Sequence, residues 1–380
     1  MEFKNCVTWK EIIQQPYIWR EEVEIIKERL PEISRFLDGL KENKIKVIFT
    51  GAGSSEFVGN TISSYINSRL DIEVVSIPTT DIVSMPEQYL DRDIATILIS
   101  CARSGNSPES VATVELADKL VKNIYHIFVT CNPEGKLAKI SENQDNKFLL
   151  LMPEKTNDKG FAMTGSFSSM VVAGVLILLR EKFEHYAEKV VYISKIIEKN
   201  LKNILADVEI ISDLDIERIV YLGDGALKGL AEEVSLKVLE LTGGKIASFY
   251  NTFLGFRHGP KSIVNDKTTI VCMMSNNKHT RVYELDLLKE FKAENGEKKI
   301  VVLDTIFDKE VKENSDFYFS FGDEKIGEME EVVAGLGYLV YGQLISLLKS
   351  SKLGINPDNP CPTGEVNRVV KGVIIHNYEK

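Results

Sequence analysis

Residues 45–56 read IKVIFTGAGSSE, and residues 218–225 read RIVYLGDG. Each stretch is a short run of mainly apolar residues that ends in Gly-x-Gly, before a segment with helical spacing. A strand that turns through glycine into a helix is the opening of a parallel α/β unit. The repetition predicts two tandem doubly wound α/β domains with parallel sheets, with a break near residues 200–215.

Apolar runs that alternate with helical segments extend this pattern along both halves. The expected strands cover residues 45–50, 72–77, 94–100, 124–130 and 148–152 in the first half, and 218–222, 269–274, 299–303 and 317–321 in the second. We expect an N-terminal helical arm over residues 1–42, a first domain over 43–205, a second domain over 206–354 and a C-terminal tail over 355–380. The arm is interpreted as a cover or a dimer contact.

The chain has 380 residues, and its net charge of −10 argues against nucleic acid as a partner, because phosphate backbones are bound by clustered Lys and Arg. An anionic substrate must therefore be held by local donors. Five scattered cysteines, none in CxxC spacing, are typical of a reduced cytosolic protein. No signal-peptide pattern opens the chain, and the most apolar stretch, Met170–Leu179, is too short to span a bilayer and predicts a buried helix. We therefore expect a cytoplasmic protein without a membrane partner.

Glycines and hydroxyl side chains follow the first expected strand. Gly53 lets the backbone approach a ligand, and Ser54 and Ser55 open the next helix, whose free N–H groups attract anions. The third glycine of a dinucleotide-binding GxGxxG motif is replaced by Glu56, which argues against NAD. Thr164, in the sequence AMTGS, opens another helix of the same half with a similar set of donors.

A second hydroxyl-rich loop, CARSGNSPE at residues 101–109, follows the third expected strand. Ser107 as N-cap and Pro108 at the first helical position predict a helix start. A capping loop alone would account for these two residues, but not for Arg103 and Ser104 before them. Because the carboxyl ends of parallel strands share one edge of a sheet, these loops predict a phosphate-binding cradle.

One expected helix of the second half carries Glu233, Lys237 and Glu240 at spacings that place them on one face. On spacing alone, an exposed and salt-bridged face is favoured. The sequence GFRHGPK at residues 255–261 places His258 beside a Gly-Pro turn, where a histidine is more often functional than structural. The histidines are too scattered to indicate a metal site, and no GxSxG motif points to a serine hydrolase. A carboxylate with a lone histidine suits metal-free proton transfer without a cofactor.

These features resemble the sugar isomerase (SIS) superfamily with two SIS domains, and within it the branch of galactosamine-6-phosphate deaminase/isomerases, also described as tagatose-6-phosphate ketose/aldose isomerases. The similarity extends over essentially the whole chain. It is carried by the segments TGAGSSEFVG, PTTDIVS, RSGNSPESVA, PEKTNDKGFAMTGS, LKVLELTGGK, GFRHGPKS and NRVVKGVIIH. Together these segments are specific for the branch, whereas any one of them indicates only the superfamily.

The resemblance to the isomerase half of glucosamine-6-phosphate synthase implies where the phosphate binds. The implied contacts fall in the hydroxyl-rich loops, on Ser55, Ser104 and Ser107, and the flanking residues expected to join them are Ser54, Arg103 and Thr164. Gly53, Glu233 and Arg368 are expected to line other parts of the substrate site.

The same resemblance implies the catalytic groups. The proton-shuttling carboxylate falls on Glu240, a supporting lysine on Lys237 and the ring-opening histidine on His258. In the synthase this histidine reaches the site from the other subunit, so a homodimer or higher homo-oligomer with shared active sites is implied.

Two positions depart from the synthase pattern. A serine that is usual in the second phosphate loop is Ala102 here, so we expect Arg103 to compensate. The Schiff-base lysine of the synthase is matched by Arg368, whose guanidinium stays protonated and cannot form an imine. This departure argues against transfer of an amide nitrogen.

The resemblance implies conversion of galactosamine 6-phosphate to tagatose 6-phosphate plus ammonia, by ring opening and proton transfer from C2 to C1. Three alternatives stay open: isomerisation of tagatose 6-phosphate without deamination, deglycation of a fructosamine 6-phosphate, and phosphosugar binding by a sensor without catalysis. Sensors of this superfamily carry a helix-turn-helix head, for which the residues before the first domain are too few. The choice between galacto and gluco substrates also stays open.

Overall fold

The computed structural model describes residues 3–40, 44–370 and 372–379. The chain forms two compact units. The first-sheet unit comprises Tyr17–Lys159, Met163–Val191 and Thr363–Lys380, and the second-sheet unit comprises Met1–Pro16, Gly160–Ala162 and Tyr192–Pro362. The four sequence blocks expected above stay a prediction, and the boundary expected at residues 42 and 43 lies outside the described residues.

The first sheet is parallel, with the strand order β2-β1-β3-β4-β5 in the described residues. Its strands are β1 (Ile45–Thr50), β2 (Glu73–Ser76), β3 (Ala95–Ala102), β4 (Ile124–Thr130) and β5 (Lys147–Leu151). Strands were expected at all five places. The central strand β3 is buried along its whole length, as expected for a parallel sheet covered on both faces.

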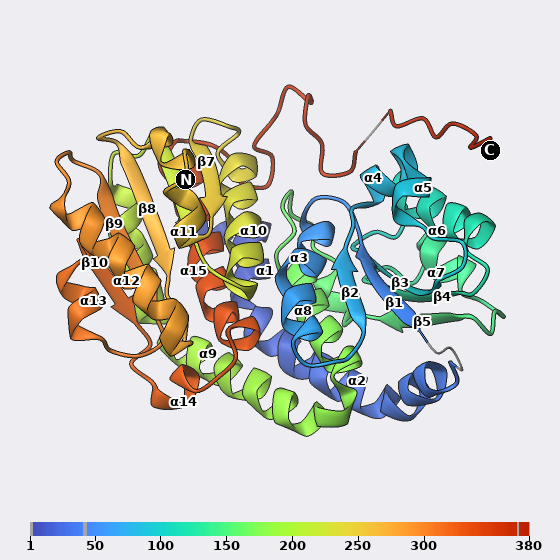
Figure 1. The fold of residues 1–380 in the computed structure, drawn as a ribbon. Helices are drawn as coiled ribbons and strands as arrows, with labels where there is room; N and C mark the ends of the chain where they lie inside the picture. Colours follow the sequence, from blue (N-terminus) through green and yellow to red (C-terminus); the bar gives the residue numbers. More distant parts are fainter. Residues whose placement is uncertain (1–2, 41–43, 371, 380) are drawn as a thin grey trace. The chain divides into compact units, whose positions relative to one another are not determined.

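Helices cover both faces of this sheet (Figure 1). They are α2 (Gln15–Asp38), α3 (Ser54–Asn67), α4 (Thr79–Ser84), α5 (Pro86–Tyr89), α6 (Pro108–Leu120), α7 (Lys136–Ile140), α8 (Gly165–Leu178) and the first part of α9 (Phe183–Asp213). Gly59 lets α3 lie close to the sheet, because a Cβ there would come within 2.7 Å of the Cβ atom of Phe49. The fully buried α8 confirms the buried helix predicted for the apolar stretch.

The second sheet repeats the first. Its strands are β6 (Arg218–Leu222), β7 (Ala247–Asn251), β8 (Thr268–Met273), β9 (Lys299–Asp304) and β10 (Phe317–Ser320). Their order, β10-β9-β8-β6-β7, is the order of the first sheet read from its other end, with β6 in the place of β1 and β8 in the place of β3. All described pairings are again parallel. This correspondence confirms two tandem doubly wound domains.

The helices of the second-sheet unit also lie on both faces of their sheet (Figure 1). They are α1 (Val7–Ile13), the rest of α9, α10 (Ala226–Leu241), α11 (Phe253–Phe256), α12 (Lys278–Ala293), α13 (Lys309–Glu313), α14 (Glu324–Gly327) and α15 (Glu331–Lys352). Apolar side chains of α11, α12 and α13 form one core with β6, β8 and β9, whereas α10 packs against β6, β7 and α15.

Two details differ from the sequence analysis. The strand β7 was not expected, because this edge strand reads ASFYN, is only partly buried and lacks a continuous apolar run. The helix α15 is a longer apolar element than Met170–Leu179. Among the described helices it has the length and composition to cross a membrane, yet 94% of its apolar window is buried inside the fold. Such burial is typical of a core helix.

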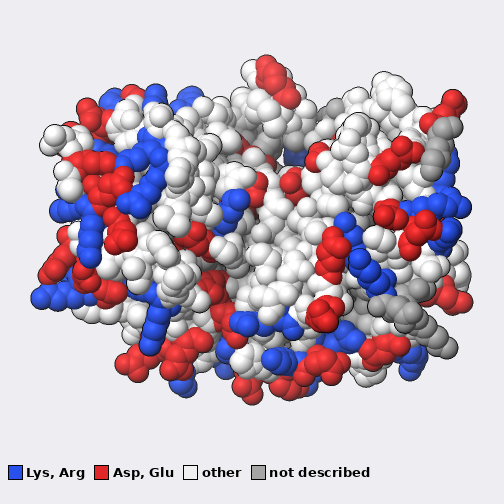
Figure 2. Space-filling model, in the orientation of Figure 1, with Lys and Arg blue, Asp and Glu red and all other residues white. Residues whose placement is uncertain are grey.

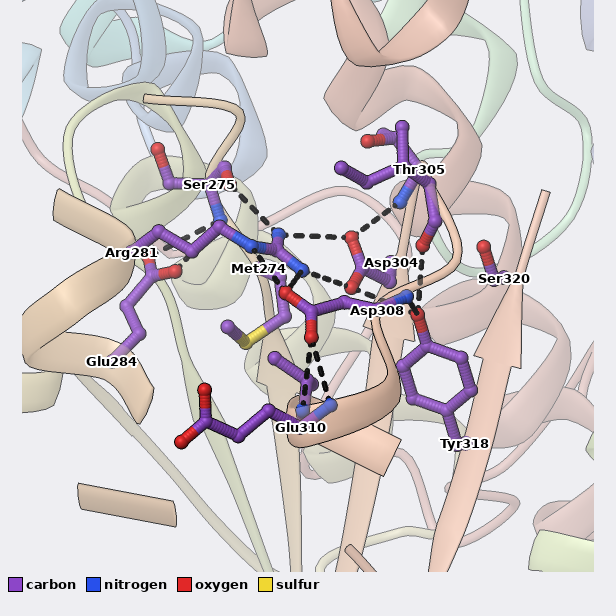
Figure 3. Close-up of polar contacts among 12 residues, drawn as sticks. Met274, Ser275, Arg281, Glu284, Asp304, Thr305, Asp308, Glu310, Tyr318 and Ser320 are labelled. Atoms are coloured by element: carbon purple, nitrogen blue, oxygen red, sulfur yellow. Dashed lines mark hydrogen bonds and ion pairs between the residues drawn. The ribbon is translucent and has the colours of Figure 1, made fainter. Parts of the chain in front are cut away.

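The carboxyl edge of the second sheet is filled by a network of polar side chains (Figure 3). Arg281 of α12 donates from Nη1 to Asp304 Oδ1 at 3.0 Å and from Nη2 to Asp304 Oδ2 at 2.5 Å. The guanidinium also contacts Asp308 at 3.1 Å, and the hydroxyl of Tyr318 lies 3.1 Å from Asp304 Oδ2. A bidentate Arg–carboxylate pair is the strongest of these geometries. It ties α12 to the end of β9.

A buried acid completes this network. Glu284 of α12 is fully buried and accepts a hydrogen bond from the backbone N–H of Ser275 at 2.9 Å. Burial raises the pKa of Glu284 to about 8, with a smaller contribution from the charge of Asp224. The unfolded chain keeps the ordinary pKa of a glutamate, so it loses this proton at a lower pH than the folded chain does.

We therefore expect Glu284 to make the folded state less stable as pH rises from about 5 to about 8, with a slope near 1.4 kcal/mol per pH unit. The variant Glu284→Gln has no proton to lose, so its melting temperature should fall less over this range than that of the wild type. Thermal unfolding at several pH values measures the difference, with the exposed Glu297→Gln as control. Parallel pH curves for wild type and Glu284→Gln would contradict the assignment.

Candidate functional site

The turn between β1 and α3 presents two serines at the start of a helix. Gly53 has φ +56°, in the left-handed region that favours glycine, and α3 begins at Ser54. Ser54 and Ser55 are buried, and the hydroxyl of Ser55 lies 3.7 Å from the sulfur of Met163. Gly51 has no room for a side chain, because a Cβ there would lie 2.5 Å from the backbone of Ser55. The helix thus directs its N-terminal N–H groups toward the carboxyl edge of the sheet.

The loop after β3 lies at the same edge, because β1 and β3 are parallel neighbours. Ser107 caps α6 by accepting a hydrogen bond from the N–H of Ser110, and Pro108 is the first helical residue, which confirms the predicted helix start. Ser104 is partly exposed, and its carbonyl accepts a 2.9 Å hydrogen bond from Asn132. The structure therefore brings the two serine-bearing loops to adjacent strand ends.

Arg103 and Arg368 join the C-terminal segment of the first-sheet unit to this loop. Arg103 is 8% exposed and donates from Nη2 to the carbonyl of Arg368 at 3.0 Å. The guanidinium of Arg368 in turn donates to the carbonyl of Asp158. Both arginines, predicted from distant parts of the sequence, are therefore linked to each other beside the serine loops.

Asp158 is a residue that the sequence analysis missed. Its buried carboxylate accepts hydrogen bonds from the N–H and hydroxyl of Thr164, at 2.8 and 3.2 Å, and from the N–H and hydroxyl of Ser166, at 2.9 and 2.6 Å. These bonds fix the start of α8. Both donors of Thr164 are thus engaged by Asp158, so its predicted contact with phosphate would require their release. The sequence does place an acidic residue shortly before the Thr-Gly-Ser helix start, and this spacing could have indicated that Asp158 binds the donors there.

The second-sheet unit carries the three predicted residues of α10 on one face, but that face is not the exposed one that spacing alone favoured. Glu233 and Lys237 are fully buried, and the side chain of Glu240 is 24% exposed. Lys237 Nζ lies 3.4 Å from Glu233 Oε1 and 2.5 Å from Glu240 Oε2. One carboxylate of the cluster is therefore open to solvent while its cationic partner is not.

The charge of Lys237 is maintained by its two neighbours. Burial by itself would lower the pKa of Lys237, but the negative charges and hydrogen bonds of Glu233 and Glu240 outweigh it and raise that pKa. A lysine that stays protonated next to Glu240 can orient that carboxylate and stabilise negative charge that develops nearby.

His258 lies in the turn that follows α11. Its backbone N–H donates to the carbonyl of Gly255 at 3.1 Å, and Gly259 follows with φ +107°. The side chain is exposed and has no hydrogen-bond or ion-pair partner in the described parts of the chain. This imidazole is therefore accessible from outside its own turn.

The corresponding turn of the second sheet offers no hydroxyl donors. Gly225 repeats the backbone of Gly53 with φ +57°, but the next residues are Ala226 and Leu227 instead of serines. Asp224 adds a carboxylate at this turn, and burial raises its pKa. On the face drawn in Figure 2, basic and acidic side chains are intermixed on the surface, without a broad basic field. The local donors of the first sheet are thus the better candidates for phosphate binding.

Comparisons with known proteins agree in pointing to one family. A SIS domain is matched over residues 39–180. The chain is 39% identical over 376 residues to the D-galactosamine-6-phosphate deaminase AgaS of Shewanella sp. strain ANA-3, covering 98% of this chain and 92% of that one. It is also 39% identical to the D-galactosamine-6-phosphate deaminase AgaS of Escherichia coli, over 98% and 96% of the two chains. The crystal structure of tagatose-6-phosphate ketose/aldose isomerase from Escherichia coli has a TM-score of 0.91 at 35% identity, over 99% of this chain and 98% of that one.

The buried charges of α10 lead to a prediction about stability. The variant Lys237→Met leaves Glu233 and Glu240 without their cation, so we expect it to reduce the free energy of unfolding by about 3–5 kcal/mol. Adding Glu233→Gln removes one of the two uncompensated carboxylates and should restore part of the loss. Thermal unfolding of the three proteins checks this, and an unchanged midpoint for Lys237→Met would contradict the proposed charge balance.

Proposed function

Because this chain belongs to the family of D-galactosamine-6-phosphate deaminases AgaS and matches a SIS domain, we propose that it converts galactosamine 6-phosphate and water to tagatose 6-phosphate and ammonia. The observation that supports this most directly is on α10, where the buried Lys237 holds a partly exposed Glu240. A solvent-facing carboxylate oriented by a fixed cation is suited to accepting and returning a proton.

The first-sheet unit binds the phosphate in this proposal. Ser55, Ser104 and Ser107 supply hydroxyl donors from two adjacent loops, and Ser54 is placed at the start of α3, where the helix dipole favours an anion. Arg103 supplies the positive charge, which is linked to the tail through Arg368. These local donors offset the repulsion between the negatively charged chain and an anionic phosphate.

The second-sheet unit supplies the acid–base groups. His258 transfers a proton to the ring oxygen, the bond between that oxygen and C1 breaks, and the C1 hydroxyl loses its proton to solvent, so that the ring opens to the 2-amino aldehyde. Glu240 then takes the proton from C2 and returns a proton to C1, and Lys237 stabilises the charge on the intermediate. One carboxylate can serve both adjacent carbons from one side, and each positioned group of this kind contributes about 10²–10⁴-fold.

Hydrolysis of the resulting C2 imine completes the reaction. Water adds to C2, the C–N bond breaks, and the nitrogen leaves as ammonia, so the ketone oxygen of tagatose 6-phosphate comes from water. Arg368 takes no covalent part, since its guanidinium cannot lose the proton needed to form an imine.

A second candidate is simple isomerisation, which the description of the similar Escherichia coli structure as a tagatose-6-phosphate ketose/aldose isomerase favours. The same acid and base would serve that reaction. Ammonia released from galactosamine 6-phosphate supports deamination, whereas interconversion of tagatose 6-phosphate with an aldose phosphate, without ammonia from the amino sugar, supports isomerisation. Fructosamine 6-phosphate belongs in the same substrate panel.

We further propose that the enzyme works in the cytoplasm as a homodimer or higher homo-oligomer. Five free cysteines fit a reducing compartment. The imidazole of His258 is exposed and has no partner among the described residues, which fits a site shared between subunits. Analytical ultracentrifugation of the purified protein tests the assembly.

The role of Glu240 is tested by ammonia release. Glu240→Gln keeps the size of the side chain but cannot accept the C2 proton, so kcat with galactosamine 6-phosphate should fall by about 10²–10⁴-fold. Lys228→Gln, at an exposed position of the same helix, serves as control and should retain wild-type kcat. Full activity in Glu240→Gln would remove the carboxylate from the mechanism.

The phosphate cradle is tested by the Michaelis constant. Ser55→Ala removes one hydroxyl donor to a charged phosphate, so KM should rise by about 10–100-fold while kcat changes little. Ser64→Ala, on the exposed side of α3, is the matched control. A KM equal to that of the wild type would mean that the phosphate does not contact Ser55.

A further inference from the structure

The turn that carries His258 is tied to α12 on both sides of the histidine. Arg257 donates from Nε to Glu290 Oε2 at 2.8 Å, and its Nη2 contacts the same oxygen. Lys261 contacts the other oxygen, Glu290 Oε1, and also contacts Glu294. A single carboxylate therefore joins the residue before His258 to the residue three positions after it.

This arrangement differs from an isolated surface ion pair, which contributes little to stability. The side chains of Arg257 and Glu290 are only about a third exposed, and that of Lys261 is 24% exposed. The ammonium of Lys261 also lies 5.3 Å from the ring centre of Phe291, on the same helix as Glu290. The pKa of Glu290 is lowered, above all by its hydrogen bond with Lys261, so the carboxylate stays charged.

The backbone between the two cations leaves little freedom. Gly259 is in the left-handed region, and Pro260 starts the short 3₁₀-helix Pro260–Ile263 with a ring that limits φ. The imidazole of His258 is exposed, so the backbone of the turn sets the point from which the side chain extends. Fixing Arg257 and Lys261 therefore fixes the backbone position of His258.

We propose that Glu290 is a positioning residue, whose carboxylate holds Arg257 and Lys261 so that the backbone of the turn keeps His258 in place for ring opening. The inference rests on the proposed function of His258. Glu290 does not touch the substrate in this scheme and acts only through the turn. Small displacements of a reacting group can cost as much as 10²-fold in rate, so the loss of such a clamp is measurable.

A double-mutant cycle tests the proposal. We expect His258→Ala to lower kcat by about 10²–10⁴-fold and Glu290→Ala to lower it by about tenfold, with KM nearly unchanged. If Glu290 acts through His258, the double variant should be no slower than His258→Ala alone. A double variant about tenfold slower than His258→Ala would show an independent role for Glu290 and overturn the proposal.

Glu310→Ala is the matched control, because Glu310 also pairs with a lysine of α12, Lys289, at 2.7 Å. It removes an exposed ion pair of the same helix without touching the turn, so kcat should stay at the wild-type value. An equal loss of kcat in Glu310→Ala and Glu290→Ala would point to a general effect on α12 and contradict the proposal.

Hydrogen–deuterium exchange separates this inference from the proposed function. Amides of residues 255–263 should exchange faster in Glu290→Ala than in wild type or Glu310→Ala, whatever the enzyme catalyses. Unchanged exchange overturns the clamp itself. Faster exchange together with full activity of His258→Ala would instead reject the role of His258, and with it the catalytic role of Glu290, while the clamp would stand.

Discussion

Both sheets depend on one backbone constraint, a glycine with positive φ between the first strand and the helix that follows it. Gly53 and Gly225 adopt nearly the same φ, +56° and +57°, and only glycine adopts this conformation at little cost. The turn directs the start of α3 or α10 to the carboxyl edge of its sheet. Since all described strands within a sheet are parallel, the loops that can carry function gather at that edge.

The two copies use this edge for different purposes. In the first, two serine-bearing loops lie at adjacent strand ends, and Asp158 engages the donors at the start of α8. In the second, the edge carries the ion pair between Arg281 and Asp304 at the end of β9, whose charges neutralise each other. The second copy carries its candidate chemistry on one face of α10 and in the turn after α11. Duplication of the backbone has therefore not duplicated the site.

Charge compensation links the candidate catalytic groups of the second-sheet unit. Lys237 is kept charged by two carboxylates, one of which is the candidate base, and the cations around His258 are held by carboxylates of the helix α12 and its end. In both cases acidic neighbours hold a cation in place. Without them, the buried charge of Lys237 would destabilise the fold, and the partly exposed side chains of Arg257 and Lys261 would be more mobile. The net negative charge of the chain thus fits a site in which acid–base groups are oriented by local ion pairs.

The sequence alone determined the elements that depend on local patterns. The Gly-x-Gly turns, the Ser107–Pro108 helix start and nine of the ten described strands follow from backbone preferences and apolar spacing, which act over a few residues. Only the tertiary structure decided that Lys237 is buried, that Asp158 engages Thr164 and Ser166, and that Glu290 joins both sides of His258. Burial and ion pairing depend on neighbours far away in the chain, and the spacing of charges along one helix does not reveal which face the rest of the fold will cover.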